Sequence, residues 1–167
     1  MQKFIIKTEN LGLRFVSKED LPHLQELEED PEVKTFFPSG PLNGDEVYDL
    51  IKDCVTDCKY KNLPCFAIFE LQSNDFIGRA YFGELPSGET KVGYLFHKTY
   101  WGKGYATEVL GALLKWAQKH IDAEYIVAYA DKNHSASFRV MEKCGMEYYK
   151  DGFYKDMESS FYRIKNK

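Results

Sequence analysis

Apolar residues repeat along this chain with two spacings, one typical of strands and one typical of helices. Residues 11–16 alternate and predict a first strand. From Asp45 to Tyr60 the apolar residues fall on one face of a helix, and Ser17 begins an earlier helical pattern. The same reasoning predicts further strands over 65–71, 76–82, 90–97, 125–130, 146–150 and 159–164, and further helices after Gly104 and over 135–144.

Turn residues separate these segments. Gly145 is a natural end for the helix over 135–144, and Asp151-Gly152 predicts the turn of a final hairpin. Residues 33–43 hold aromatic, proline and glycine residues and predict an irregular loop. The order of elements predicts an α/β (α+β) fold, a mixed sheet of about seven strands with about four helices on its faces.

Size and composition narrow the class of protein. With 167 residues, 44% hydrophobic and 29% charged, the chain is expected to form one soluble globular domain over 1–167. A net charge of -4 argues against a general nucleic-acid partner. No apolar run approaches the roughly 18 residues that span a bilayer, so we expect no membrane partner. Residues 1–7 lack the features of a signal peptide, which favours a cytoplasmic location.

The cysteines and histidines do not predict a metal centre. No Cys-x-x-Cys is present, and the histidines lack metal-binding spacing, so we expect no bound metal. Buried free thiols fit a reducing cytoplasm. The residues concerned are Cys54, Cys58, Cys65, Cys144, His23, His97, His120 and His134.

The most informative segment runs from Tyr100 to Glu108. Two glycines stand there between a predicted strand and a predicted helix. Such a loop is often only a turn, but it also brings the unpaired amides of a helix start close to an anion, most often a phosphate. The P-loop pattern fails because Gly104 follows Gly-Lys, and the dinucleotide pattern fails because Thr107 replaces its third glycine.

The order of elements and this loop resemble the GNAT superfamily of acetyl-CoA-dependent N-acetyltransferases. The superfamily signature is Gln/Arg-x-x-Gly-x-Gly/Ala, which Gly102 and Gly104 match and Thr99 does not. The string Trp-Gly-Lys-Gly-Tyr-Ala-Thr-Glu resembles the branch of ribosomal-protein N-terminal acetyltransferases. The segments over 30–33, 92–94, 133–137 and 139–146 resemble other segments of that branch.

The resemblance implies a mostly antiparallel sheet and the co-substrate acetyl-CoA, whose acetyl group is attacked directly by a primary amine. A loop amide cradle would hold the CoA pyrophosphate, and the end of the fourth strand would bind the pantetheine. Asn133 would contact the pantetheine arm, or cap the helix that follows. The residues expected at the cofactor are Leu95, Phe96, His97, Trp101, Gly102, Lys103, Gly104, Tyr105, Ala106, Thr107 and Asn133.

The catalytic residues are less clear from the resemblance. Many members use a Tyr to protonate the departing thiolate, but Met141 stands at that position and leaves Ser137 as a substitute. Ser137 comes one residue later than the branch's usual serine. Glu84 and Glu89 are candidate bases, or else surface carboxylates, and Lys91 replaces a glutamate that is common in the branch. Phe36 and Phe37 are expected to line the acceptor pocket, or to pack the helix pair.

Three functions remain open at this point. The first is acetyl transfer to an amine, which includes a peptide or protein N-terminus, by a monomer or homodimer. The second is a CoA-binding regulatory module without catalysis, which the missing Tyr would suit. The third is acetylation of a small molecule such as an aminoglycoside or a polyamine, since an acidic chain suits a cationic acceptor.

Overall fold

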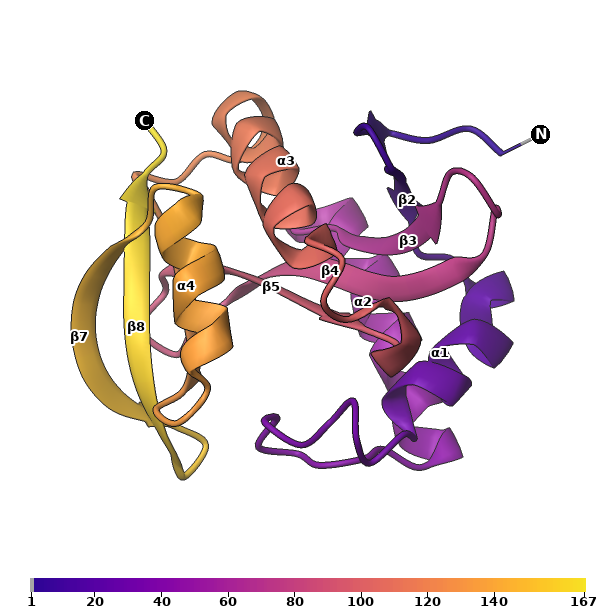
Figure 1. Ribbon diagram of the computed structural model, residues 1–167, viewed down its shortest axis with the longest axis horizontal. Helices are drawn as coiled ribbons and strands as arrows, with labels where there is room; N and C mark the ends of the chain where they lie inside the picture. Colours follow the sequence, from indigo (N-terminus) through magenta and orange to yellow (C-terminus); the bar gives the residue numbers. More distant parts are fainter. Residues whose placement is uncertain (1) are drawn as a thin grey trace.

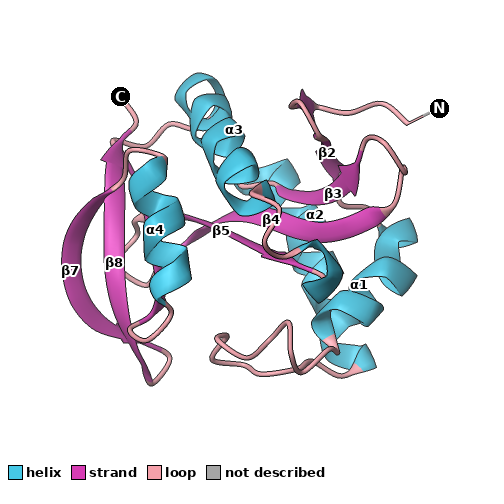
Figure 2. Ribbon diagram, viewed as in Figure 1, coloured by secondary structure: helices cyan, strands magenta, loops and turns pink. Residues whose placement is uncertain are grey.

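The computed structural model describes residues 2–167 and contains one mixed sheet with helices on both faces (Figures 1 and 2). The sheet has eight strands in the order β1-β2-β3-β4-β5-β6-β8-β7. The strands are β1 Ile6–Lys7, β2 Leu11–Phe15, β3 Cys65–Glu70, β4 Phe76–Glu84, β5 Thr90–Phe96, β6 Tyr125–Asp131, β7 Glu147–Tyr154 and β8 Met157–Lys165. The helices are α1 Leu21–Glu28, α2 Gly44–Lys61, α3 Tyr105–His120 and α4 Ser135–Lys143, with short 3-10 turns η1 Lys18–Asp20 and η2 Lys98–Tyr100.

The predicted order of elements is confirmed, with one addition and one correction. The short strand β1 was not expected. The turn predicted at Asp151-Gly152 is wrong, because both residues lie inside β7 and Gly152 pairs with Ser159. The hairpin turns instead at Lys155 and Asp156, which take φ angles of 46° and 66°. The Asp-Gly pair is a strong turn signal, yet pairing with β8 outweighs it here.

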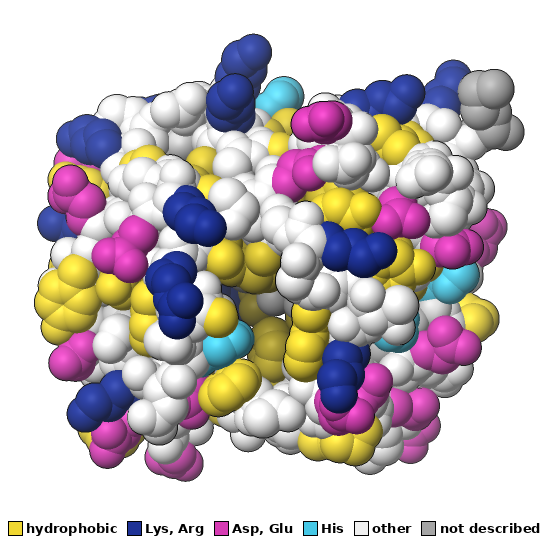
Figure 3. Space-filling model, viewed as in Figure 1, with side chains coloured by type: hydrophobic (Ala, Val, Ile, Leu, Met, Phe, Trp, Pro, Cys, Tyr) yellow, Lys and Arg dark blue, Asp and Glu magenta, His cyan; other side chains and the backbone are white. Residues whose placement is uncertain are grey.

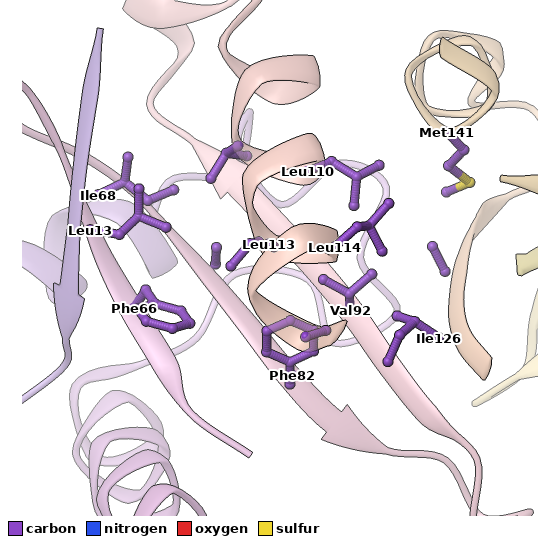
Figure 4. Packing of buried hydrophobic residues seen from close by; sticks show 14 of the residues in the cluster. Leu13, Phe66, Ile68, Phe82, Val92, Leu110, Leu113, Leu114, Ile126 and Met141 are labelled. Atoms are coloured by element: carbon purple, nitrogen blue, oxygen red, sulfur yellow. The ribbon is translucent and has the colours of Figure 1, made fainter. Parts of the chain in front are cut away.

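Two separate apolar layers hold the helices to the sheet. On one face, α3 places Leu110, Leu113 and Leu114 against Phe82 and Val92 (Figure 4). On the other face, α1 and α2 pack on the inner residues of β3 and β4. The leucines of α3 are almost fully buried, and each buried leucine stabilises the fold by about 1.5–3 kcal/mol. The start of α3 is therefore held rigidly next to the sheet.

The sheet opens in its middle, between β5 and β6. These two strands are parallel, and they pair only at Thr90 with Ile126 and at Lys91 with Val127. Every other adjacent pair of strands in residues 2–167 is antiparallel. β5 therefore stays joined to β4 along its length, while its other edge is open from Val92 to Phe96. We call this stretch the open edge of β5.

A buried ion cluster lies on the α1–α2 side of the sheet. The Glu28 carboxylate, with no exposed surface, accepts hydrogen bonds from Lys34 Nζ at 2.7 Å and from Arg79 Nε at 3.0 Å. Burial by itself would raise the pKa of Glu28, but the charges of Arg79 and Lys34 lower it below its ordinary value. One carboxylate thus balances two buried cations and ties the loop after α1 to β4.

Within residues 2–167, no helix has the length and apolar character that crossing a membrane requires.

Replacing Glu28 by Gln should destabilise the fold strongly. The change leaves Lys34 and Arg79 buried without a counter-charge, and breaking such a cluster costs about 3–5 kcal/mol. Urea unfolding of the variant and the parent measures this loss. Asp57→Asn is the control, because its pair with Lys61 is solvent-exposed and contributes at most about 1 kcal/mol. Equal, small losses in both variants would contradict the role given to Glu28.

Candidate active site

The glycine loop leaves a row of backbone amides free. Gly102 and Gly104 take φ angles of 78° and 81°, a conformation that side chains disfavour, and Gly104 is the N-cap of α3. Within the described chain, no N–H group from Gly102 to Thr107 donates to another protein group, and the first such bond in α3 is from Glu108 to the Gly104 carbonyl. A Cβ at either glycine would meet nothing within 4 Å. Space in front of free amides at a helix start suits an anion.

Four contacts hold this loop and the first turn of α3 in place. The indole Nε1 of Trp101 donates to the Phe96 carbonyl at 2.9 Å, which ties the loop to the open edge of β5. The Tyr105 hydroxyl donates to Glu70 at 2.6 Å, and this bond raises the pKa of Tyr105 to about 12. The Lys103 ammonium lies 5.5 Å from the Tyr100 ring centre. Thr107 is half-buried, and its carbonyl accepts a bond from the Cys144 thiol.

The end of β5 brings the strand residues expected at the cofactor beside this loop. Phe96 packs in the α3 layer and Leu95 in the α1–α2 layer, so their side chains are buried. The His97 N–H donates to the Ile77 carbonyl of β4 at 2.9 Å. Because alternate residues of a strand direct their backbone groups to opposite sides, those of Phe96 face the open side of β5. The backbone of this segment, rather than its side chains, is available to a ligand.

Polar groups from β5 and α4 meet across the opening. The Tyr94 hydroxyl is buried and has no hydrogen-bond partner within residues 2–167. Burial raises its pKa, and Ser137 is the polar side chain beside it. Ser137 Oγ lies 3.2 Å from His134 Nδ1. Burial lowers the pKa of His134, so the ring is neutral near pH 7 and its unprotonated nitrogen can accept a hydrogen bond from Ser137.

The loop between α1 and α2 closes one side of this opening. Phe36, still 38% exposed, stacks on His134 with ring centres 4.1 Å apart and planes at 10°. Phe37 is half-buried and packs in the α1–α2 layer, with the Lys34 ammonium 4.8 Å from its ring centre. Figure 3 shows a hollow in this face of the molecule, between α4 and the end of β5, with hydrophobic side chains and a histidine at its edge.

A cavity of about 390 Å³ lies on the other side of the sheet. Its walls come from α2, from the middle of the sheet, from the loop after α1 and from the tip of the β7–β8 hairpin. The lining side chains include Phe37, Arg79, Tyr81, Glu84, Lys91 and Tyr154. A cavity of this size is in the range of small-ligand sites.

These features identify the family when they are compared with known proteins. The family model described as the acetyltransferase (GNAT) domain matches residues 10–147. The chain belongs to the GNAT acetyltransferase family. It is therefore an enzyme, an acyltransferase, and the fold and family predicted from the sequence are confirmed.

Individual relatives agree with this assignment. An uncharacterized N-acetyltransferase of Bacillus subtilis, YnaD, is 29% identical over 90% of this chain and 85% of its own length. The structure of RimL, a ribosomal L7/L12 α-N-protein acetyltransferase in complex with CoA, matches with a TM-score of 0.82 at 16% identity, over 98% of both chains. Spermidine N-acetyltransferase from Vibrio cholerae, in complex with CoA and spermine, matches with a TM-score of 0.79 at 16% identity, over 95% of this chain and 96% of its own. At these identities the two structures show the fold alone.

The two carboxylates expected as GNAT bases lie in different settings. Glu84 is exposed at the end of β4 and lines the cavity. Glu89 lies in the turn between β4 and β5, where it accepts a bond from Ser87 Oγ at 2.8 Å. That turn is at the opposite end of β5 from the open edge. Glu84 pairs with Thr90 at this same end, so the structure keeps Glu84 beside the cavity but separates both carboxylates from the open edge.

Sequence reasoning missed two polar groups of this GNAT site. Tyr94 was seen only as part of an apolar strand, and His134 only as a histidine without metal spacing. The helix cap expected at Asn133 is wrong, since His134 is the N-cap residue and Asn133 is exposed in the turn after β6. A signal was present, because Tyr94 sits between residues that face the other side of the strand. Tyr94 of β5 lies near α4 only because of the order of strands in the sheet, and that order cannot be read from the sequence.

No group of three or more His, Cys, Asp and Glu side chains within residues 2–167 is arranged to hold a metal ion.

Proposed function

We propose that this GNAT protein transfers the acetyl group of acetyl-CoA to a primary amine by direct attack, with no acyl-enzyme. The acceptor is a peptide or protein N-terminus, or a small amine. The observation that carries the proposal is the row of free amides from Gly102 to Thr107, placed directly beside the open edge of β5. The free amides suit an anionic pyrophosphate, and the open strand edge beside them suits an extended pantetheine arm.

The residues present fit CoA. The amides of Gly102, Lys103, Gly104, Tyr105, Ala106 and Thr107 would hold the pyrophosphate, and the Lys103 ammonium adds a positive charge. The backbone at Leu95, Phe96 and His97, with the exposed Asn133 opposite, would bind the pantetheine. Trp101 joins the two parts through its bond to the Phe96 carbonyl. CoA supplies, as its thioester, an acetyl group that is activated for transfer.

The thiolate that leaves needs a proton. Ser137 can donate it, with the side chains of Tyr94 and His134 beside it. The Tyr that many GNAT members use is absent, and Met141 is buried in the core at that position. Ser137 holds a proton on Oγ beside the unpartnered Tyr94 hydroxyl, and the neutral His134 Nδ1 fixes its orientation. The buried Tyr94 hydroxyl would then gain the partner that it lacks within the described chain.

The acceptor would enter from the side of the cavity and of the loop between α1 and α2. Phe36 and Phe37 line this approach from its two sides, one at the opening and one at the cavity. An amine must be neutral to attack. Glu84, at the cavity edge and opposite Thr90, and Glu89, in the adjacent turn, are candidate bases that would take this proton through water. The four free cysteines agree with the reducing cytoplasm expected for this enzyme.

Replacing Gly104 by Ala should weaken CoA binding by roughly tenfold or more, about 1.4 kcal/mol. The added methyl group opposes the φ of 81° and enters the space in front of the amides. Isothermal titration with CoA measures the effect. Gly88→Ala is a matched control, since Gly88 has a φ of 90° and equally open surroundings, but lies in the β4–β5 turn. Unchanged affinity in Gly104→Ala would refute the cradle.

Replacing Ser137 by Ala should lower kcat by roughly 100-fold, as the loss of a general acid does. Release of CoA thiol in the presence of acetyl-CoA and a panel of amines measures it. In the parent enzyme kcat should also fall as the pH drops through the pKa of His134, which lies below 6.5, because a doubly protonated ring can no longer accept a hydrogen bond from Ser137. Ser135→Ala, in the same helical turn but exposed, should retain full activity. A Ser137→Ala enzyme with more than half of the parent rate would exclude this role, and turnover of no amine would exclude the function.

A further inference from the structure

Lys91 occupies an aromatic cage in the wall of the cavity. Its ammonium lies 4.7 Å from the ring centre of Tyr154, 5.6 Å from that of Tyr129 and 5.8 Å from that of Tyr81. It donates to the Tyr154 hydroxyl at 3.0 Å and to that of Tyr129 at 3.4 Å. Burial alone would raise the pKa of Tyr154, but the hydrogen bond and the charge of Lys91 lower it. The cage therefore fixes a half-buried positive charge at a defined place.

This charge has no carboxylate partner. No Asp or Glu oxygen of the described chain lies within 4.0 Å of the Lys91 ammonium, and two tyrosine hydroxyls use only two of its three donors. Cations that are removed from water are normally paired. Arg79 and Lys34, in the same cavity wall, follow that rule through Glu28. Lys91 is the cation that can accept a further anionic partner.

The other charges that line the cavity also favour an anionic ligand. The buried Lys34 and Arg79 and the half-buried Lys91 line the cavity, and Glu28 is the one buried carboxylate among its lining residues in the described chain. The remaining carboxylates lie toward solvent: Glu84 and Asp53 are exposed, and Asp57 forms a pair with Lys61 at 3.9 Å. A polycationic acceptor would meet like charge inside the cavity, although the whole chain is acidic. An anionic group would meet opposite charge there.

Lys91 also stands at the point where the sheet opens. It is the last residue of β5 that pairs with β6. Tyr81 of the cage covers Gly93, the second residue of the open edge, so closely that a Cβ there would lie 2.4 Å from the phenol oxygen. Because a strand rises about 3.3 Å per residue, Lys91 is about 7 Å from Gly93 and about 13 Å from Leu95 along β5. A short acceptor that binds Lys91 with one end can therefore reach the site of acetyl transfer with its other end.

We propose that the acceptor carries an anionic group, a carboxylate or a phosphate, and that Lys91 binds this group while the amine reaches the open edge of β5. The proposal rests on the acetyl transfer proposed above and names the chemical class of its acceptor. Lys91 is then a specificity-determining residue. The third donor of its ammonium takes the anion, and the tyrosines hold the ammonium in position.

The test compares acceptors that differ only in one end group. An ω-aminocarboxylate, an ω-aminoalkyl phosphate, the amino alcohol and the diamine of equal length are acetylated by the parent enzyme, by Lys91→Met and by Lys91→Glu. Short peptides with Glu, Gln or Lys beside the N-terminal residue distinguish a free small acceptor from a peptide. CoA release gives kcat and KM for each acceptor.

The parent should prefer the anionic acceptors by roughly tenfold or more in kcat/KM, as expected for one charge-assisted hydrogen bond. Lys91→Met should raise KM for those acceptors by a similar factor and leave the amino alcohol unchanged, while Lys91→Glu should favour the diamine. Lys150→Met removes an exposed lysine on β7 that also lies near aromatic rings, and should change nothing. A parent without this preference, or an equal fall of kcat for every acceptor in Lys91→Met, would overturn the proposal.

A second measurement separates this proposal from the function on which it rests. If no amine is acetylated, the acetyl-transfer function fails, but binding can still be measured by titrating the same acceptors into the protein saturated with CoA. Tighter binding of the aminocarboxylate than of the diamine, lost in Lys91→Met, supports the anion site. Equal binding of both, or a preference that survives in Lys91→Met, overturns it.

Discussion

The parting of β5 from β6 after Lys91 is the constraint on which the rest of this structure depends. Inside a sheet, backbone groups are normally satisfied by the next strand. Here two residue pairs join the strands, and from Val92 onward β5 has an open edge in the middle of the sheet. Protein groups satisfy it only in part, as where Trp101 donates to the Phe96 carbonyl. An extended ligand can supply the rest.

The elements around this opening are held rigidly so that it keeps its shape. The leucines of α3 bury themselves on β4 and β5 and fix the free amides of the helix start beside the open edge. On the other side, Glu28 joins the loop after α1 to Arg79 of β4. The result is a division of the sheet into two faces. One face presents amides to a cofactor anion, and the other presents a cavity with fixed positive charge.

Much of the cofactor side could be predicted from the sequence, because it depends on local signals. Gly102 and Gly104, the apolar strand before them and the helix after them specify an anion loop without any knowledge of the fold. The acceptor side depends on contacts between distant segments. Lys91 meets Tyr129 and Tyr154 only because β6 and the β7–β8 hairpin fold beside β5. For the same reason Tyr94 and His134 did not stand out, and the acidic composition suggested a cationic acceptor that the buried charges oppose. The turn at Lys155 and Asp156 escaped prediction because neither residue is a glycine.

If the free amides from Gly102 to Thr107 and the open edge of β5 together form the CoA site, bound CoA must protect the backbone of both segments. Hydrogen–deuterium exchange of the backbone, with and without saturating CoA, tests it most directly. We predict that bound CoA slows exchange in residues 102–107 and 93–97, while exchange in the β7–β8 hairpin changes little. Unchanged exchange in both segments at saturating CoA would show that they do not form the CoA site.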